Sequence, residues 1–215
     1  MKLLEMKNRL ALETAKLIFQ KGIEVVFIGG TALNAFYAHY RYSEDLDIGY
    51  LKDDKKSDIE KLLREHGYDV QRTGLKYRDI VSLEGVSIKM DVIEYKKKYN
   101  GFADRAIGGV NLRTLALEEF AVEKTISFFT REDAAGMARD GYDLYTLEKT
   151  HGSVLDVIHK AKAIIRKNIV SLDYNVNLFE SDTKKAESAV VPYLRKPVEV
   201  KKVLDFLKAL RGVLK

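Results

Sequence analysis

An apolar run that ends in two glycines and a threonine constrains the fold of this chain more than any other feature. Residues 23–28 are mostly β-branched or aromatic, which predicts a buried strand. Gly29 and Gly30 end this run, and glycine permits a positive φ and a close approach of the backbone to a ligand. Thr31 then stands where a helix N-cap is expected, ahead of a helical pattern over residues 32–38. The sequence therefore predicts a strand–turn–helix unit near the N-terminus.

This turn has two interpretations. The free N–H groups and the helix dipole at the start of a helix favour an anion such as a phosphate. The alternative is an ordinary strand-to-helix turn with a good cap, which is common in α/β proteins. The turn by itself does not separate the two.

Two aspartates with one residue between them follow the turn. Residues 46–50 predict a short strand with Asp45 at its start, so Asp45 and Asp47 point to the same face. Two carboxylates so close together repel each other unless a cation lies between them. Their hard oxygen atoms suit Mg²⁺ or Mn²⁺, which also bridge substrate phosphates. The alternative is a pair of acids on a hydrated strand face or in a capping turn.

A third acid, Asp91, lies in the middle of a later apolar strand. Residues 86–95 alternate as a strand after a Glu84–Gly85 turn. The predicted strand places Ile88, Met90, Val92 and Glu94 on one face and Ser87, Lys89, Asp91 and Ile93 on the other. A buried charge without a partner is costly, and coordination of a metal by three acids would remove that cost. The alternative is that this strand face is exposed.

Two helical segments further along carry polar residues that fit the same kind of site. Lys124 lies in a helical pattern over residues 118–126 and can bind a triphosphate as a point charge. Arg139 and Asp143 are four residues apart, so they share one face of a helix. The alternative for both segments is a hydrated helix face with an i,i+4 ion pair.

Together these residues resemble the polymerase-β-like nucleotidyltransferase superfamily, and within it the AbiEii/AbiGii-type toxin nucleotidyltransferases. The family pattern is a Gly-Gly-[Ser/Thr] turn, an Arg-x-Ser-x-Asp-x-Asp block, a third Asp on a later strand, a Lys on a helix and Arg-Asp-x-x-Asp-Leu. The matching residues are Gly29, Gly30, Thr31, Arg41, Ser43, Asp45, Asp47, Asp91, Lys124, Arg139, Asp140, Asp143 and Leu144. The resemblance spans residues 25–147. Gly141 inside the last motif is a mild departure, because glycine within a helix costs about 1 kcal/mol relative to alanine.

The resemblance implies a metal-dependent transfer of NMP from an NTP to an acceptor hydroxyl. Asp45 and Asp47 would hold Mg²⁺ (or Mn²⁺) on the triphosphate. Asp91 would complete the metal site and orient or deprotonate the attacking hydroxyl, and Lys124 would hold the outer phosphates. The other expected nucleotide-binding residues are Gly29, Gly30, Thr31, Ser43, Arg139, Asp140 and Asp143. Such a site works by positioning and charge neutralisation in an in-line displacement.

The patterns along the chain predict an α/β (α+β) protein with a small mixed sheet followed by helices. A helix ended by Gly22 begins the chain, and a helix over residues 58–65 follows the Asp-x-Asp strand. Residues 68–73, 77–83 and 86–95 predict three strands of a meander, and the last predicted helix covers residues 198–210. We expect a nucleotidyltransferase core over residues 1–112 and a helical subdomain over residues 113–215 packed on that core.

Composition excludes several classes of protein. The 215 residues include no cysteine, so neither disulfides nor Cys-ligated zinc are expected. No apolar run is long enough for a transmembrane helix, and residues 1–20 lack the apolar core of a signal peptide. We therefore expect a cytoplasmic protein with no membrane partner. The histidines show no metal-ligand spacing; they are His39, His66, His151 and His159.

The net charge of +5 is unevenly distributed. Residues 154–215 hold 13 Lys and Arg residues against 7 Asp and Glu residues, whereas the preceding residues are close to neutral. This asymmetry suggests contact with nucleic acid or with an acidic partner, and the alternative is a helical face that is merely hydrated. Candidate contact residues are Lys201, Lys202, Lys208 and Arg211.

Three functions are consistent with these features. The leading hypothesis is the toxin of a toxin–antitoxin pair, a nucleotidyltransferase that modifies an RNA, with the 3′ end of tRNA as acceptor and a cognate antitoxin protein as partner. The second is a transferase that modifies a small molecule or a protein hydroxyl. The third is a non-catalytic binding module with the same fold. A basic surface outside the cleft favours RNA, whereas a cationic small molecule needs an acidic pocket.

Overall fold

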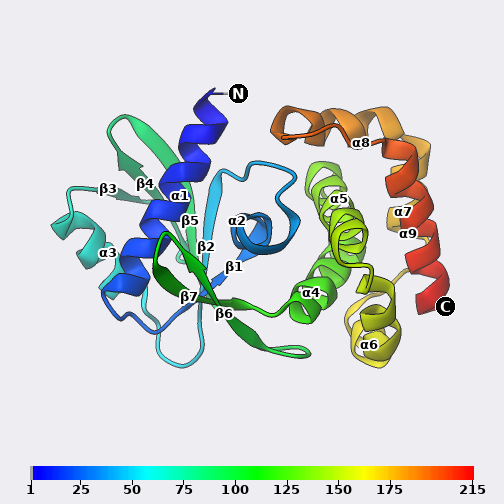
Figure 1. The fold of residues 1–215 in the computed structure, drawn as a ribbon, viewed down its shortest axis with the longest axis horizontal. Helices are drawn as coiled ribbons and strands as arrows, with labels where there is room; N and C mark the ends of the chain where they lie inside the picture. The colour runs from blue at the N-terminus through cyan, green and yellow to red at the C-terminus, as the bar shows by residue number, and fades with distance from the viewer. Residues whose placement is uncertain (1) are drawn as a thin grey trace. The chain divides into compact units, whose positions relative to one another are not determined.

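The computed structural model describes residues 2–215, which form two compact units (Figure 1). The sheet unit comprises residues 2–36, 42–97 and 102–115. The helical unit comprises residues 37–41, 98–101 and 116–215. Met1, the first residue of the predicted core, lies outside the described residues.

A seven-stranded mixed sheet forms the centre of the sheet unit. Its strands are β1 (Val26–Ile28), β2 (Asp45–Tyr50), β3 (Asp69–Arg72), β4 (Arg78–Leu83), β5 (Val86–Glu94), β6 (Phe102–Ile107) and β7 (Val110–Leu115). Their order in the sheet is β3-β4-β5-β2-β1-β7-β6. The β2/β5 and β1/β7 pairs are parallel and the other neighbouring pairs are antiparallel. The predicted mixed-sheet fold class and the β3–β4–β5 meander are confirmed, whereas the β6–β7 hairpin was not predicted.

Helix α1 (Lys2–Gln20) lies across the strands and packs on the sheet (Figure 1). Its buried positions recur every three to four residues and include Leu10, Ala11, Ala15 and Ile18. This spacing places one apolar stripe against the strands, as expected for an amphipathic helix. The predicted N-terminal helix is therefore confirmed.

Helix α2 (Gly29–Leu33) begins directly where β1 ends and continues as a π-helical turn, η1 (Asn34–Ala38). The prediction that Thr31 is the N-cap is wrong, because Ile28 occupies the N-cap position and Thr31 lies inside α2. The physical reason is a tertiary bond: the Thr31 hydroxyl donates to the backbone carbonyl of Asp45 on β2. The threonine therefore fixes the helix to the next strand instead of capping it.

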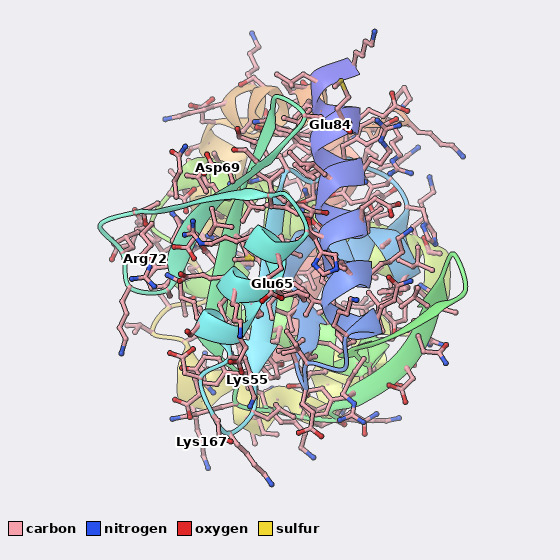
Figure 2. All side chains as sticks on the ribbon, turned by 90° about the vertical axis from the view of Figure 1, so that its left-hand side faces the viewer. Lys55, Glu65, Asp69, Arg72, Glu84 and Lys167 are labelled. Carbon is pink, nitrogen blue, oxygen red and sulfur yellow. The ribbon has the colours of Figure 1, made fainter. Side chains whose placement is uncertain are left out.

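Helix α3 (Lys56–Glu65) is joined to the outer strands β3 and β4 by ion pairs, and Figure 2 looks onto this part of the sheet unit. Arg72 on β3 donates to Glu60 of α3 through Nε at 3.1 Å and Nη2 at 2.8 Å. Lys56 Nζ lies 2.9 Å from Oδ1 of Asp79, whose side chain is fully buried. These contacts explain how a sheet edge rich in charge stays attached to its helix.

The helical unit is built from α4 (Leu117–Thr130), α5 (Ala134–His151), α6 (Val154–Asn168), α7 (Tyr174–Ser181), α8 (Thr183–Val190) and α9 (Val200–Leu214), with a 3₁₀ turn, η2 (Val191–Tyr193). Helix α5 is buried along most of its length. A Cβ on Gly141 of α5 would lie 3.2 Å from Leu207 Cδ1 and 3.4 Å from Phe128 Cε2. The glycine that departs from good helix propensity therefore lets α4 and α9 approach α5 closely.

Two short segments from the first half of the chain belong to the helical unit. The ring of Tyr37 lies edge-on to the ring of Phe120, with centroids 5.7 Å apart. The buried Glu119 carboxylate accepts hydrogen bonds from the backbone N–H groups of Lys98 and Tyr99, at 2.6 and 2.7 Å. One carboxylate on α4 thus satisfies the backbone donors of a loop that would otherwise be unpaired.

No helix within residues 2–215 has the length and apolar character needed to cross a bilayer. The cytoplasmic location expected from the sequence stays a prediction.

Candidate active site

The three predicted metal-binding aspartates share one face of the sheet. β2 and β5 run parallel, and their register places Asp47 beside Asp91 and Asp45 beside Lys89. Because side chains alternate along a strand, Asp45, Asp47 and Asp91 point to the same side. All three carboxylates are half-buried, whereas the residues between them, such as Leu46 and Met90, are fully buried. The predicted side-by-side arrangement of Asp45 and Asp47 agrees with this strand.

The glycine turn lies against the second of these aspartates. Ile28, the last residue of β1, pairs with Asp47 of β2 in the sheet. Gly29 follows with a φ of +74°, and a Cβ at this position would lie 1.8 Å from Asp47 Oδ2. Only glycine fits here, for both conformational and steric reasons. The predicted phosphate turn and the predicted metal carboxylates are therefore parts of one local structure.

Further hydrogen bonds hold the turn and the strand that follows it. Asn34 Nδ2 donates to the carbonyl of Gly30 at 3.0 Å, and the hydroxyl of Thr31 is directed to the carbonyl of Asp45. The backbone N–H of Ser43, a buried residue, donates to Asn8 Oδ1 of α1 at 3.0 Å. The roles of Gly30, Thr31 and Ser43 in nucleotide binding remain predictions.

Asp91 has a cationic partner that the sequence analysis missed. Arg78 Nε donates to Asp91 Oδ1 at 2.7 Å and Arg78 Nη2 donates to Asp91 Oδ2 at 2.6 Å. These hydrogen bonds raise the pKa of Arg78, and the nearby carboxylate of Asp45 adds to the effect. A signal for this pair exists in the sequence: counting outward from a two-residue Glu84–Gly85 turn places Arg78 opposite Asp91.

The donor set tests whether a divalent metal fits this face. Among residues 2–215, no group of three or more His, Cys, Asp or Glu side chains is arranged as a metal site. At Asp91 the Arg78 guanidinium contacts both carboxylate oxygens. Asp45 and Asp47 provide hard oxygen donors on one strand, beside a backbone cradle at Gly29 that a Cβ would fill. The pair Asp45/Asp47 therefore fits a divalent cation, and Asp91 fits one only when Arg78 moves away.

In the helical unit, Asp143 on α5 is the centre of a buried charge cluster. It accepts hydrogen bonds from Nε and Nη2 of Arg41, both at 2.9 Å, and from the Tyr40 hydroxyl at 2.8 Å. Lys124 Nζ lies 3.0 Å from Asp143 Oδ2. Burial alone raises the pKa of Asp143, but Arg41 and Lys124 lower it by more. The carboxylate therefore stays ionised at pH values well below the usual pKa of an aspartate.

Asp140 extends this cluster by one turn of α5. Its carboxylate lies 2.6 Å from Lys124 Nζ and also accepts from Nε of Arg131. Burial alone lowers the pKa of Lys124, and Asp140 and Asp143 more than reverse this effect, so the pKa of Lys124 is raised. Three cations meet the two buried carboxylates here, and the exposed carboxylate of Asp133 also lies 3.5 Å from Arg131 Nη1, so the formal charges of the cluster balance.

Arg139 does not join this cluster. It is half-buried and forms no ion pair with any residue in the part of the chain that the structure describes. The alternative of an i,i+4 pair with Asp143 is not realised, because Asp143 pairs with Arg41 and Lys124 instead. The structure thus brings together Lys124, Asp140 and Asp143, and it adds Arg41, Arg131 and Tyr40 to them.

Comparisons with known proteins identify the family and the fold of this chain. Residues 12–189 match the family described as nucleotidyl transferase AbiEii toxin, type IV TA system. Comparison with curated protein sequences gave no significant match. In fold, the chain is similar to JHP933 from Helicobacter pylori, with a TM-score of 0.60 and 18% identity over 97% of this chain and 90% of that chain.

Two further structures show the same likeness. A putative nucleotidyltransferase from H. pylori has a TM-score of 0.59 and 18% identity, over 97% of this chain and 93% of that chain. An antigenic nucleotidyltransferase-like protein from Paracoccidioides brasiliensis has a TM-score of 0.50 and 17% identity, over 87% of this chain and 92% of that chain. At these identities the likeness establishes the fold.

Proposed function

This chain belongs to the AbiEii family of nucleotidyl transferase toxins, and from that premise we propose that it transfers NMP from an NTP to the 3′-hydroxyl of an RNA, with tRNA as the acceptor. Family membership makes the chain a nucleotidyltransferase and implies a nucleotide substrate and an antitoxin partner. The RNA acceptor, the use of Mg²⁺ or Mn²⁺ and the action as the toxin of a toxin–antitoxin pair are parts of the proposal.

One observation carries this proposal. Gly29 lies so close to Asp47 that no side chain fits between them, with a virtual Cβ 1.8 Å from Asp47 Oδ2. A backbone turn suited to phosphate and a carboxylate pair suited to a divalent metal are therefore immediate neighbours. A metal–triphosphate complex needs both at once, whereas an ordinary strand–helix turn needs neither.

In the proposed reaction the sheet unit holds the reacting phosphates. Bound Mg²⁺ would supply positive charge that neutralises the triphosphate and the developing charge on the leaving group. Asp45 and Asp47 would hold the metal, and the turn at Gly29, Gly30 and Thr31 would hold the phosphate chain. The acceptor oxygen attacks the α-phosphorus as the bond to pyrophosphate breaks, and Asp91 receives the hydroxyl proton.

In the proposed reaction the helical unit supplies the positively charged side chain of Lys124. Lys124 is fixed between Asp140 and Asp143, at 2.6 Å and 3.0 Å from their carboxylate oxygens. A lysine held in this way stays protonated and loses little side-chain entropy when it binds a phosphate. We assign Lys124 to the outer phosphates, with Asp140 and Asp143 as positioning residues for it. Arg139 and Ser43 are assigned to the nucleotide.

The test is a transfer assay with each of the four NTPs, labelled at the α-phosphate, together with Mg²⁺ and total RNA. Label on RNA that requires the divalent cation is the expected result. Label on the protein or on a small molecule would replace the RNA acceptor with the alternatives above. Absence of any transfer by the folded protein would favour a binding module.

The matched variant is Asp47→Asn, which removes one charge from the carboxylate pair without opening a cavity. We expect transfer to fall at least 100-fold while the melting temperature stays near that of the wild type, because the substitution affects metal binding rather than packing. Wild-type activity in a folded Asp47→Asn protein would remove the metal-site assignment.

A further inference from the structure

The basic charge of the C-terminal region is not spread evenly over its helices. Helix α6 buries Val154, Val157, Ile158, Ala161 and Ile165. Its other positions hold the basic side chains His159, Lys160, Lys162, Arg166 and Lys167, of which all but the half-buried Lys162 are exposed. Asp156 in the first turn is the only acid of this helix. The outward surface of α6, defined by these five basic residues, therefore carries four Lys and Arg side chains against one acid.

Most basic side chains of the last helix, α9, already form ion pairs. Lys202 pairs with Glu199 at 2.5 Å, Lys208 with Glu180 at 2.5 Å and Arg211 with Asp173 at 3.1 Å. Three of the four candidate contact residues suggested by the sequence are thus in local ion pairs on the surface of the helical unit.

The basic residues of α6 differ from those of α9 in this respect. Within the described residues 2–215, none of the five takes part in an ion pair. Lys167 can be found at the exposed end of α6 in Figure 2. The basic side chains of α6 therefore form a local group of positive charge without ion pairs.

The outward surface of α6 has a regular geometry. Lys160 and Lys167 are seven residues apart, as are His159 and Arg166, so each pair lies on one side of the helix about 10 Å apart along its axis. The exposed Ala163 lies between the two rows. Two rows of basic side chains with a small residue between them leave room for a strand of phosphates to lie along the helix.

The chemistry of this surface favours RNA over an acidic protein. Interface cores between proteins are enriched in aromatic residues and depleted in lysine. The exposed positions of α6 hold Asp156, His159, Lys160, Ala163, Arg166, Lys167 and Asn168, with no large apolar side chain among them. A phosphate backbone needs only positive charge at suitable spacing.

A role in helix stability accounts for only part of this pattern. Cations in the last turn of a helix interact favourably with its dipole, which applies to Arg166 and Lys167. Lys160 and Lys162 lie in the middle of the helix, where the dipole has little effect. The helix dipole therefore does not account for these two lysines.

We infer that the outward surface of α6 binds the phosphate backbone of the RNA acceptor. This inference rests on the proposed function for its choice of polyanion, and it assigns RNA contact to α6 in place of the paired residues of α9. The contacts are electrostatic and independent of base sequence.

The test compares two triple variants of the full-length chain. The first is Lys160→Gln/Arg166→Gln/Lys167→Gln on α6. The control is Lys184→Gln/Lys185→Gln/Lys201→Gln, which removes the same charge from exposed lysines of α8 and α9 that form no ion pair with any residue from 2 to 215. Unchanged melting curves confirm that both variants fold.

Affinity for a purified tRNA pool is measured between roughly 50 and 300 mM salt, where counterion release makes the affinity fall steeply as the salt concentration rises. We expect the α6 variant to bind tRNA at least about tenfold more weakly at low salt. The slope of the logarithm of the binding constant against the logarithm of the salt concentration should be less steep by about 2, because each of the three lost contacts contributes about 0.7 for single strands. The control should bind like the wild type.

Equal losses in the two triple variants would overturn the inference, since net charge alone would then explain binding. Unchanged tRNA affinity with weaker binding of polyglutamate would also overturn it, in favour of an acidic protein partner. The α6 variant should retain triphosphate and Mn²⁺ binding. If the wild type binds tRNA through α6 but transfers nothing to it, the surface stands and the proposed reaction fails.

Discussion

Arg41 and Asp143 form a buried ion pair with two hydrogen bonds, although 102 positions separate them in the sequence. Arg41 opens the Arg-x-Ser-x-Asp-x-Asp block, and Asp143 is the second aspartate of the Arg-Asp-x-x-Asp-Leu motif. Two segments that look like separate signatures in the sequence are therefore one structural element of the helical unit. The pair also explains why Arg41 is buried at 4% exposure, since a guanidinium in the interior needs a carboxylate.

Breaking this pair should lower the unfolding free energy of the helical unit. Arg41→Ala leaves the Asp143 carboxylate buried with one partner fewer, which should cost roughly 3–5 kcal/mol of unfolding free energy. Chemical denaturation, followed by the helical signal in far-UV circular dichroism, measures the loss of unfolding free energy. Arg139→Ala is the matched control, because Arg139 lies on the same helix as Asp143 without an ion pair to any described residue, and it should cost less than about 1 kcal/mol. Equal losses in the two variants would contradict a special role for the pair.

The same cluster predicts how stability depends on pH. The pKa of Asp143 is lowered in the folded state because Arg41 and Lys124 outweigh the opposing effect of burial. Its contribution to stability is therefore complete above the unfolded pKa of about 3.9 and is lost as pH falls below that value. We expect the unfolding free energy of the wild type to fall by up to about 1.4 kcal/mol per pH unit from this group between pH 4 and pH 2. Asp143→Asn should show a correspondingly flatter profile, and identical profiles would remove the assignment.

Local patterns predicted the parts of the fold that depend on short-range physics. The patterns along residues 46–50 and 86–95 predicted both strands, which the structure has at Asp45–Tyr50 and Val86–Glu94. They also predicted the shared face of Asp45 and Asp47, because the period of two is a property of the strand itself. The β6–β7 hairpin was missed although the sequence holds a signal for it, the two-residue Gly108–Gly109 turn between Ile107 and Val110.

Features that depend on distant contacts were beyond these patterns. Thr31 is a good N-cap residue by composition, yet its hydroxyl bonds to Asp45 in the folded chain. The charge cluster around Asp143 includes Arg41 and Lys124, which are distant from it in the sequence, so no local sequence pattern predicts it. Arg78 is the exception, since the two-residue turn fixes its register with Asp91.

Gly29 should be the least replaceable residue of the turn. Gly29→Ala places a Cβ against Asp47 in a backbone conformation that alanine avoids, so the variant should lose Mn²⁺ and triphosphate binding together. Gly109→Ala is the control, because Gly109 has a similar φ of +80° but open space around its Cβ. It should cost only the backbone strain of about 1–2 kcal/mol and keep both ligands. Isothermal titration of each folded variant with MnCl₂ and with a non-hydrolysable NTP gives the comparison, and normal binding by Gly29→Ala would show that the turn only connects β1 to α2.

The last prediction concerns the competition between Arg78 and a metal for Asp91. The guanidinium contacts both oxygens of Asp91, so a divalent cation that uses Asp91 must displace it. Removing the competitor in Arg78→Gln should therefore raise the affinity for Mn²⁺ several-fold.

The control for this prediction is Arg72→Gln, which breaks a similar arginine–carboxylate pair with Glu60 on the neighbouring strand β3 and should leave Mn²⁺ affinity unchanged. Mn²⁺ binding is followed by electron paramagnetic resonance of the free ion, a readout that does not depend on turnover. The double variant Arg78→Gln/Asp91→Asn separates the two explanations, because it should lose the gain if Asp91 is a ligand. An Mn²⁺ affinity that is the same in the wild type and in Arg78→Gln would mean that the metal is held by Asp45 and Asp47 without Asp91.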